Sequence, residues 1–119
     1  MTAGTIALFL DMLSSERGAS PNTLAAYRHD LEDADHRLKQ ARAALETADT
    51  GALEALMRSL AKDGLSPATA ARRLSALKRY YRFLLKEGVR ADDPTAGMKG
   101  PKRARALPKV LSEDEVSRL

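Results

Sequence analysis

The residues best suited to bind another molecule are the bases between Leu65 and Lys86, a stretch that contains no acidic residue. At about 100° per residue on a helix, Arg72, Arg79 and Lys86 share a narrow sector opposite the apolar positions. A stripe of one sign repels itself, and solvated helix faces usually mix signs. Arginine can reach guanine O6 and N7 in a bidentate manner, and lysine suits phosphate, so the stripe favours a nucleic-acid contact over a solvated face. The six bases are Arg72, Arg73, Lys78, Arg79, Arg82 and Lys86.

A metal site is the other chemistry that the spacing allows. His29, Asp33 and His36 share one face of a predicted helix at i, i+4 and i+7. The pair of histidines on adjacent turns that is typical of zinc sites is absent, and a solvated polar face explains all three residues. We therefore expect no metal and no other cofactor.

No residue of the chain is predicted to be catalytic. Tyr27 and Tyr81 fall on apolar stripes, which indicates core residues, and Tyr80 flanks the second stripe. The sequence has no glycine-rich phosphate loop and no Gly-x-Ser-x-Gly motif. The absence of cysteine excludes cysteine nucleophiles, thiolate metal sites and disulfides. We expect this chain to bind a partner and to catalyse nothing.

Four amphipathic helices are expected to position these groups, because helical periodicity dominates and alternating β-branched runs are missing. Gly18, Gly64 and Gly88 are predicted to end the first, third and fourth helices. The expected helices cover about Thr5 to Arg17, Ser20 to near Leu45, a third from after Asp49-Thr50 to Gly64, and Ser66 to about Glu87. The inward positions are Ile6, Phe9, Leu10, Leu13, Leu24, Tyr27, Leu31, Ala34, Leu38, Leu53, Leu56, Met57, Leu60, Ala70, Leu74, Leu77, Tyr81 and Leu84. This pattern predicts an all-α, compact four-helix bundle.

The second and fourth helices open with similar sequences, Ser20-Pro21-Asn22-Thr23 and Ser66-Pro67-Ala68-Thr69. Serine can cap a helix, and proline fits its first position, so two ordinary N-caps explain the pattern. The functional interpretation is that both helix N-termini offer free N–H groups, partial positive charge and a threonine hydroxyl to phosphates or base edges.

Charge is distributed unevenly along the 119 residues, whose net charge is +4. Residues 1–60 hold six Lys/Arg and nine Asp/Glu, whereas residues 61–119 hold fourteen and seven. The asymmetry indicates a polyanionic partner, and nucleic acid is favoured over a membrane surface because no aromatic-anchored basic helix is present. No apolar run is long enough to span a bilayer, and no signal peptide is evident. We expect a cytoplasmic protein with no membrane partner.

After Gly88 the sequence changes character, since three prolines and two glycines lie between residues 89 and 111. We expect an extended basic linker here. Ser112 and Glu115 then form a capping box that predicts the start of a fifth helix.

The ordered set of motifs resembles the core-binding domain of Xer-type tyrosine recombinases and phage integrases. Residues 20–31, SPNTLAAYRHDL, look like the second helix of that domain, and residues 66–85 are similar to its fourth helix. Glu87-Gly88, Asp93-Pro94, Pro101-Lys102, Leu107-Pro108 and Leu111-Ser112-Glu113 follow in the order of the family. One departure is that residues 39–47 lack the glycine-containing turn expected after the second helix.

The resemblance implies a bundle of the integrase SAM-like type over residues 1–88, an interdomain linker over 89–111, and the first turns of an otherwise absent catalytic domain over 112–119. It implies binding to a double-stranded recombination half-site by the second and fourth helices, with other protomers in a synaptic tetramer. Strand breakage and rejoining would belong to the full-length parent, which could resolve chromosome dimers, integrate phage DNA or move an element. The implied DNA-binding residues are Thr23, Arg28, His29, Thr69, Arg72, Arg73, Arg79, Lys102, Arg103 and Arg105.

The alternative from another class is a helical protein-interaction or oligomerisation module whose basic face docks an acidic partner. A third hypothesis keeps the family but assigns the domain to holding protomers together through Phe9, Met12 and Leu13 of the first helix, where core packing is the simpler explanation. We expect the isolated domain to be monomeric or weakly associating.

Overall fold

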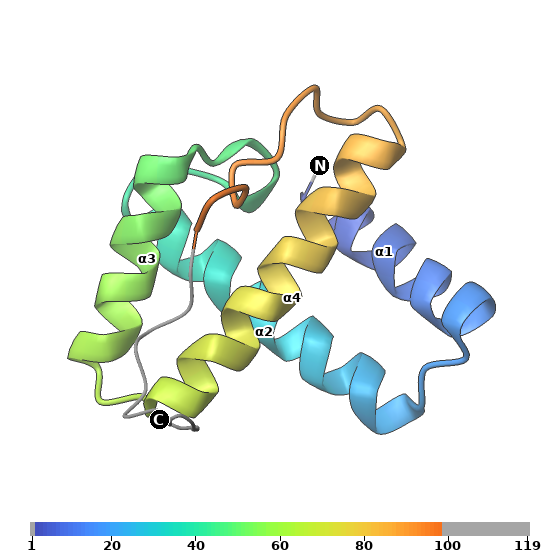
Figure 1. Cartoon of the computed structure of the whole chain (residues 1–119), viewed down its shortest axis with the longest axis horizontal. Coiled ribbons are helices and arrows are strands. Elements are labelled where there is room, and N and C mark those ends of the chain that lie inside the picture. Colours follow the sequence, from blue (N-terminus) through green and yellow to red (C-terminus); the bar gives the residue numbers. More distant parts are fainter. Residues whose placement is uncertain (1, 99–119) are drawn as a thin grey trace, which may run out of the picture.

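In the computed structural model, which describes residues 2–98, three of the four α-helices begin at a capping side chain. Ser20 Oγ accepts from Thr23 N at 3.2 Å, and Ser66 Oγ accepts from Thr69 N at 3.1 Å. Asp49 caps the third helix in the same way. The elements are α1 (Thr2–Arg17), α2 (Pro21–Gln40), the short 3-10 helix η1 (Leu45–Thr47), α3 (Thr50–Lys62) and α4 (Pro67–Lys86) (Figure 1). The all-α prediction is confirmed, with α1 starting three residues before Thr5.

Three helices end in the same hydrogen-bonded turn. After α3 and α4 the turn places Gly64 and Gly88 at φ 87° and 77°, where glycine carries no steric cost. After α2 the residue at this position is Arg42, with φ 62°. Ala43 N donates to Leu38 O at 2.8 Å and closes the turn. The prediction that the second helix extends to near Leu45 is therefore wrong.

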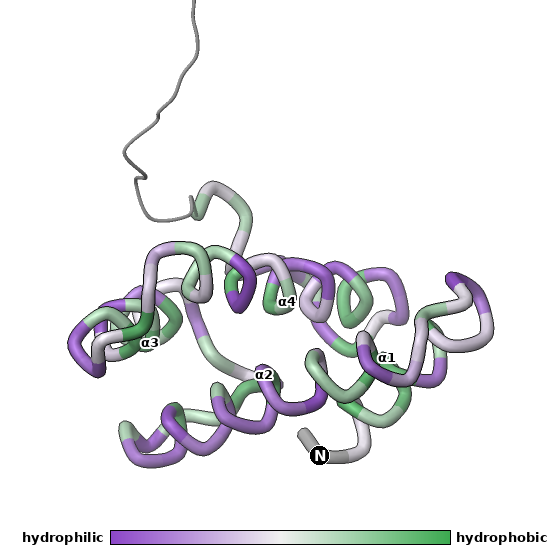
Figure 2. The backbone as a smooth tube through the Cα atoms, turned by 90° about the horizontal axis from the view of Figure 1, so that it is seen from below, coloured by the Kyte–Doolittle hydropathy of each residue, from purple (hydrophilic) through white to green (hydrophobic). Residues whose placement is uncertain are grey.

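The core lies between α4 and the other helices. In Figure 1, α4 crosses α2, with α1 and α3 on opposite sides of the crossing. Buried apolar residues of α1 and α4 belong to one core cluster, and Figure 2 shows apolar and hydrophilic residues alternating along both helices. Every residue predicted to face inward is buried or half-buried, so the periodicity correctly identified the core.

Two adjacent tyrosines lie at the centre of this core. The Tyr80 hydroxyl is 2.7 Å from Thr5 Oγ1, and the Tyr81 hydroxyl donates to Leu45 O at 2.6 Å. Burial raises the pKa of Tyr80 to about 12 and raises the pKa of Tyr81 as well. Tyr80, predicted only to flank the stripe, is fully buried. The phenols are protonated core groups that connect α4 to α1 and η1.

The chain after Gly88 packs against the bundle up to Met98. Arg90 Nη1 donates to Glu46 O and Ala48 O at 3.2 and 2.8 Å. Its guanidinium lies 5.3 Å from the centroid of the Tyr81 ring. The first ten residues of the expected linker thus form irregular but packed structure.

A second set of contacts holds the end of this segment. Thr50 Oγ1 donates to Pro94 O at 2.8 Å, and Lys78 Nζ donates to Met98 O at 2.5 Å. Pro94 and Met98 are buried. Lys78, one of the six bases of α4, therefore has a backbone acceptor within the described chain.

Candidate nucleic-acid interface

An ion-pair network joins α2 and α4 where the two helices cross. Arg72 Nη2 donates to Asp30 Oδ1 at 3.1 Å. Arg73 Nη1 donates to Asp33 Oδ2, and Arg73 Nε lies 3.6 Å from Asp30 Oδ1 without a hydrogen-bond partner in the described part of the chain. The Asp30 side chain is only 3% exposed. Two acids of α2 therefore compensate two bases of α4.

The network extends to the end of α3 through Arg37. Its Nε donates to Asp33 Oδ2 at 2.9 Å, and its Nη1 donates to Asp63 Oδ2 at 2.6 Å. The hydrogen bonds that Arg37 donates to Asp63 and Asp33 raise the pKa of its guanidinium. Partial burial alone would raise the pKa of Asp33, but the hydrogen bonds from Arg37 and Arg73 outweigh it and hold that pKa below its ordinary value.

This network changes the interpretation of the basic stripe. The sequence predicts a purely basic face on this helix, which favours an external anion because the helix itself holds no acid. Arg73 is 12% exposed and is turned toward the acids of α2, whereas the Arg72 side chain remains 57% exposed beside Asp30. The sequence could not reveal this pairing, because the partners are about forty residues apart and meet only when the helices cross. Arg72 is thus an oriented surface donor.

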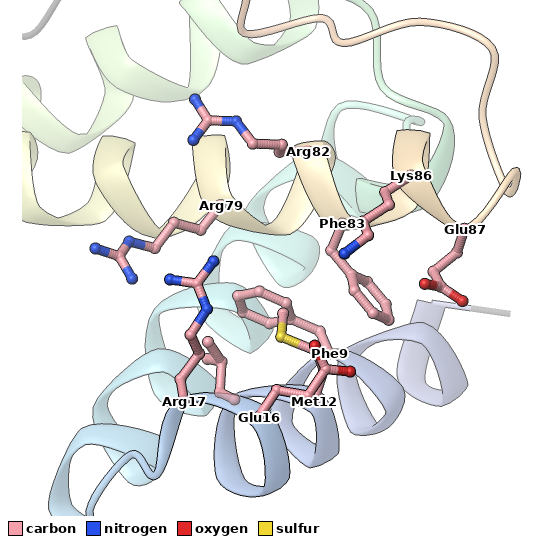
Figure 3. A pocket seen from close by; sticks show the side chains of 10 residues that line it. Phe9, Met12, Glu16, Arg17, Arg79, Arg82, Phe83, Lys86 and Glu87 are labelled. Atoms are coloured by element: carbon pink, nitrogen blue, oxygen red, sulfur yellow. The ribbon is translucent and has the colours of Figure 1, made fainter.

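Three further bases of α4 and one of α1 remain exposed. Arg79, Arg82, Lys86 and Arg17 form no ion pair within residues 2–98. Figure 3 shows Arg79 and Arg17 reaching toward one another from the two helices. Since like charges repel, this part of the surface favours an anionic partner.

The two capped N-termini have the same local geometry. Ser20 Oγ lies 3.0 Å from Thr23 Oγ1, and Ser66 Oγ lies 3.0 Å from Thr69 Oγ1. Each threonine hydroxyl proton has no acceptor among the described residues. Both helices begin at the lower edge of the molecule in Figure 1 and rise from it in opposite directions. The repeated opening sequence thus produces two similar donor sites on one edge.

The remaining predicted site residues are placed less uniformly. Arg28 is exposed, and its Nη1 lies 3.9 Å from Oε2 of Glu32, one turn along α2. His29 is also exposed. His29, Asp33 and His36 do not form a metal site in the structure. Asp33 accepts hydrogen bonds from Arg37 and Arg73, and His36 Nε2 lies 3.3 Å from Gln40 Nε2. No group of three His, Asp or Glu in the described chain could hold a metal ion.

None of the helices within residues 2–98 has the length and apolarity needed to cross a membrane. Lys102, Arg103 and Arg105, together with the predicted fifth helix, lie outside the described residues.

Three curated relatives span nearly all of the chain. The protein named tyrosine recombinase XerD from Caulobacter vibrioides is 51% identical over 93% of this chain and 36% of its own length. The protein of the same name from Rhizobium meliloti is 46% identical over the whole chain and 38% of its own length. That from Bradyrhizobium diazoefficiens is 49% identical over 94% of this chain and 35% of its own length. The chain therefore spans little more than a third of these relatives.

The family described as phage integrase, N-terminal SAM-like domain matches residues 6–88. The match begins within α1, covers α2 to α4 and ends at Gly88, which follows α4. No solved structure matches the chain significantly.

Proposed function

Because the chain belongs to the phage integrase N-terminal SAM-like domain family, we propose that it binds double-stranded DNA as one part of a tyrosine recombinase. The observation that carries the proposal is the row of exposed bases on α4 that lack acidic partners among the described residues. A basic stripe on one helix, at the edge of a compact domain, is the electrostatic footprint of a nucleic-acid contact.

We propose that Arg72 and Arg79 reach base edges in the major groove, while Arg82 and Lys86 contact phosphates. Arg72 suits readout of a base because Asp30 holds one edge of its guanidinium and leaves the rest exposed, so less side-chain freedom is lost on binding. Arg73 would act indirectly, because its contacts with Asp33 fix the crossing of α2 and α4.

The N-termini of α2 and α4 would supply a second set of donors. Thr23 and Thr69 carry free hydroxyl protons in first turns whose backbone N–H groups favour phosphate. Arg28 and His29 would extend this contact along α2, and Lys102, Arg103 and Arg105 would follow the DNA backbone.

The proposal extends to the longer tyrosine recombinase of which this chain would be a part. Strand breakage and rejoining would be carried out by a catalytic domain that follows this one, and other recombinase protomers would assemble on the same DNA. The names of the relatives support this assignment.

Fluorescence anisotropy of the full chain with labelled duplex DNA, from low to moderate salt, tests the proposal. If about five phosphates are neutralised, the slope of log K against log salt should be roughly −4 to −5. The variant Arg72→Ala/Arg79→Ala should weaken binding by roughly tenfold or more, because two proposed base contacts are lost. We expect Arg72→Ala to reduce discrimination between sequences, whereas Arg105→Ala should weaken binding to all duplexes alike.

The matched control is Arg58→Ala/Lys62→Ala, which removes the same charge from exposed positions of α3. This control should retain nearly all of the affinity. Equal losses in both double variants would show that net charge alone drives binding, and absence of duplex binding at low salt would favour the protein-interaction alternative.

A further inference from the structure

A groove between α1 and α4 has an apolar floor that the DNA contact proposed above does not use, although three bases of that contact lie on its rim. Its first hollow has a volume of about 210 Å³ and lies between the middle of α1 and the second half of α4 (Figure 3). A second hollow adjoins it and shares Met12 and Phe83 with it. The two hollows form one continuous groove, which we call the α1–α4 groove.

The floor of the α1–α4 groove is apolar. Phe9 is fully buried, and its ring centroid lies 5.7 Å from that of Phe83, while Met12 is half-buried beside them. Leu8 and Val89 line the second hollow and are 57% and 46% exposed. They are two of the three large hydrophobic residues that are exposed in the described chain. Apolar surface is therefore concentrated along this groove.

The rim of the α1–α4 groove is mostly basic. Arg17, Arg79, Arg82 and Lys86 line the first hollow, against the two acids Glu16 and Glu87. Although these charges share one hollow, no ion pair joins them. In Figure 3 the side chains of Arg17 and Arg79 extend along one end of the groove, while Lys86 and Glu87 lie at the other end.

The combination of floor and rim selects among possible occupants. A phosphodiester backbone would use the bases but leave the apolar floor exposed to water. A neutral small molecule would fill the apolar floor but leave the basic rim without a partner. A peptide with apolar anchors and acidic neighbours satisfies both the floor and the rim.

We propose that the α1–α4 groove docks a peptide segment of another protein, in which one or two large apolar side chains are flanked by Asp or Glu. The apolar side chains fill the hollow over Phe9, Met12 and Phe83. The acids face Arg17 and Lys86 (Figure 3). Docking leaves Arg72 free, because Arg72 lies at the crossing with α2, but it competes with the phosphate contact proposed for Lys86.

Selection of a displayed library of random peptides on the full chain tests this proposal. The enriched peptides should combine acidic residues with large apolar ones, and the strongest is then made with a fluorescent label. Leu8→Glu and Arg17→Glu should each weaken its binding by about tenfold, as expected for loss of a central contact. The matched controls are Leu85→Glu and Arg58→Glu, which make the same changes at exposed positions that do not line the groove. They should leave binding unchanged.

Several results would overturn the proposal. These are a failure to enrich any peptide, enrichment of peptides without acids, or peptides that bind both groove variants as well as the wild-type chain. If Leu8→Glu weakens duplex DNA binding as much as Arg79→Ala does, the floor belongs to the DNA surface. If sedimentation shows self-association that Leu8→Glu abolishes, the occupant is a second copy. Circular dichroism verifies folding, and Arg17→Glu decides the question if Leu8→Glu unfolds.

Discussion

Asp30 is the residue on which the geometry of Arg72 depends. Its carboxylate is buried and accepts a hydrogen bond from Arg72 across the helix crossing. A buried acid of this kind is tolerated because the arginines compensate it, and its loss leaves them without an acceptor. Asp30 therefore contributes both to stability and to the orientation of a surface donor.

We expect Asp30→Asn to lower the free energy of unfolding by about 1–3 kcal/mol, because a charged acceptor is replaced by a neutral amide. Urea unfolding measures the change. Glu32→Gln is the control on the same helix, since its pair with Arg28 is exposed and long, and its removal should cost less than about 1 kcal/mol. Equal costs for the two variants would mean that the contacts of Asp30 contribute no more than a surface pair.

Asp33 should make stability depend on pH in the acid range. Its pKa in the folded chain lies below the ordinary value of 3.8, so the unfolded chain takes up the proton first as pH falls. The stabilisation is therefore complete at neutral pH and is lost as pH falls below about 4 toward the lower folded pKa. Unfolding free energies measured from pH 7 to pH 3 should fall in the wild-type chain.

Asp33→Asn should flatten part of this acid decline and cost about 1–2 kcal/mol at neutral pH. Asp11→Asn is the control, since Asp11 is exposed and forms no ion pair with any described residue. A decline as steep in the Asp33 variant as in the wild-type chain would assign the pH dependence to other carboxylates.

At the scale of the element, the end of α2 is the least favourable helix terminus of the three that share its turn. Arg42 adopts the left-handed conformation that glycine adopts after α3 and α4. A non-glycine residue pays about 1–2 kcal/mol for this conformation, and part of that is offset by the lower entropy of its unfolded state.

Arg42→Gly should therefore raise the free energy of unfolding by about 0.5–1 kcal/mol. Thermal unfolding measures the gain. Gln40→Gly, two residues earlier and still helical, should instead lose about 1 kcal/mol, which separates the conformational effect from the loss of a side chain. A destabilised Arg42→Gly would show that the arginine side chain stabilises the turn by other means.

The same turn shows how far the sequence predicts the elements. The caps at Ser20 and Ser66 and the core periodicity depend on local chemistry, and they predicted the starts of α2 and α4 and the buried faces. The end of α2 was wrong because arginine gives no local signal for a left-handed turn. The burial of Tyr80 and the pairing of Arg72 with Asp30 were missed because both depend on how helices cross.

At the scale of the whole molecule, Arg90 ties the chain after α4 to the bundle. It contacts two carbonyls around η1, the face of Tyr81 and the carboxylate of Asp92. These contacts connect residues far apart in the sequence, so no local pattern predicted them. The folded domain therefore continues past Gly88, the glycine that ends α4.

Arg90→Ala should release the segment up to Met98 and lower the free energy of unfolding by about 2 kcal/mol, because two carbonyls lose a charged donor. Hydrogen exchange should increase in residues 89–98 and near η1, with little change in α3. Arg90→Lys should restore part of the protection, because an ammonium can still donate to one carbonyl. Unchanged exchange in the alanine variant would mean that Pro94 and Met98 hold the segment by themselves.

The ion-pair network at the helix crossing also bears on the rates at which a polyanion such as DNA would associate with this surface and dissociate from it. Its three carboxylates and three guanidinium groups cancel, so from a distance Arg72 contributes little to the field of the molecule. The bases Arg17, Arg79, Arg82 and Lys86, which form no ion pair within residues 2–98, would contribute more to that field and accelerate the approach of a polyanion. Arg72 would matter only after contact, when it slows departure. If the chain binds DNA as proposed, the crossing of the two helices would give capture and residence time to different residues of the same surface.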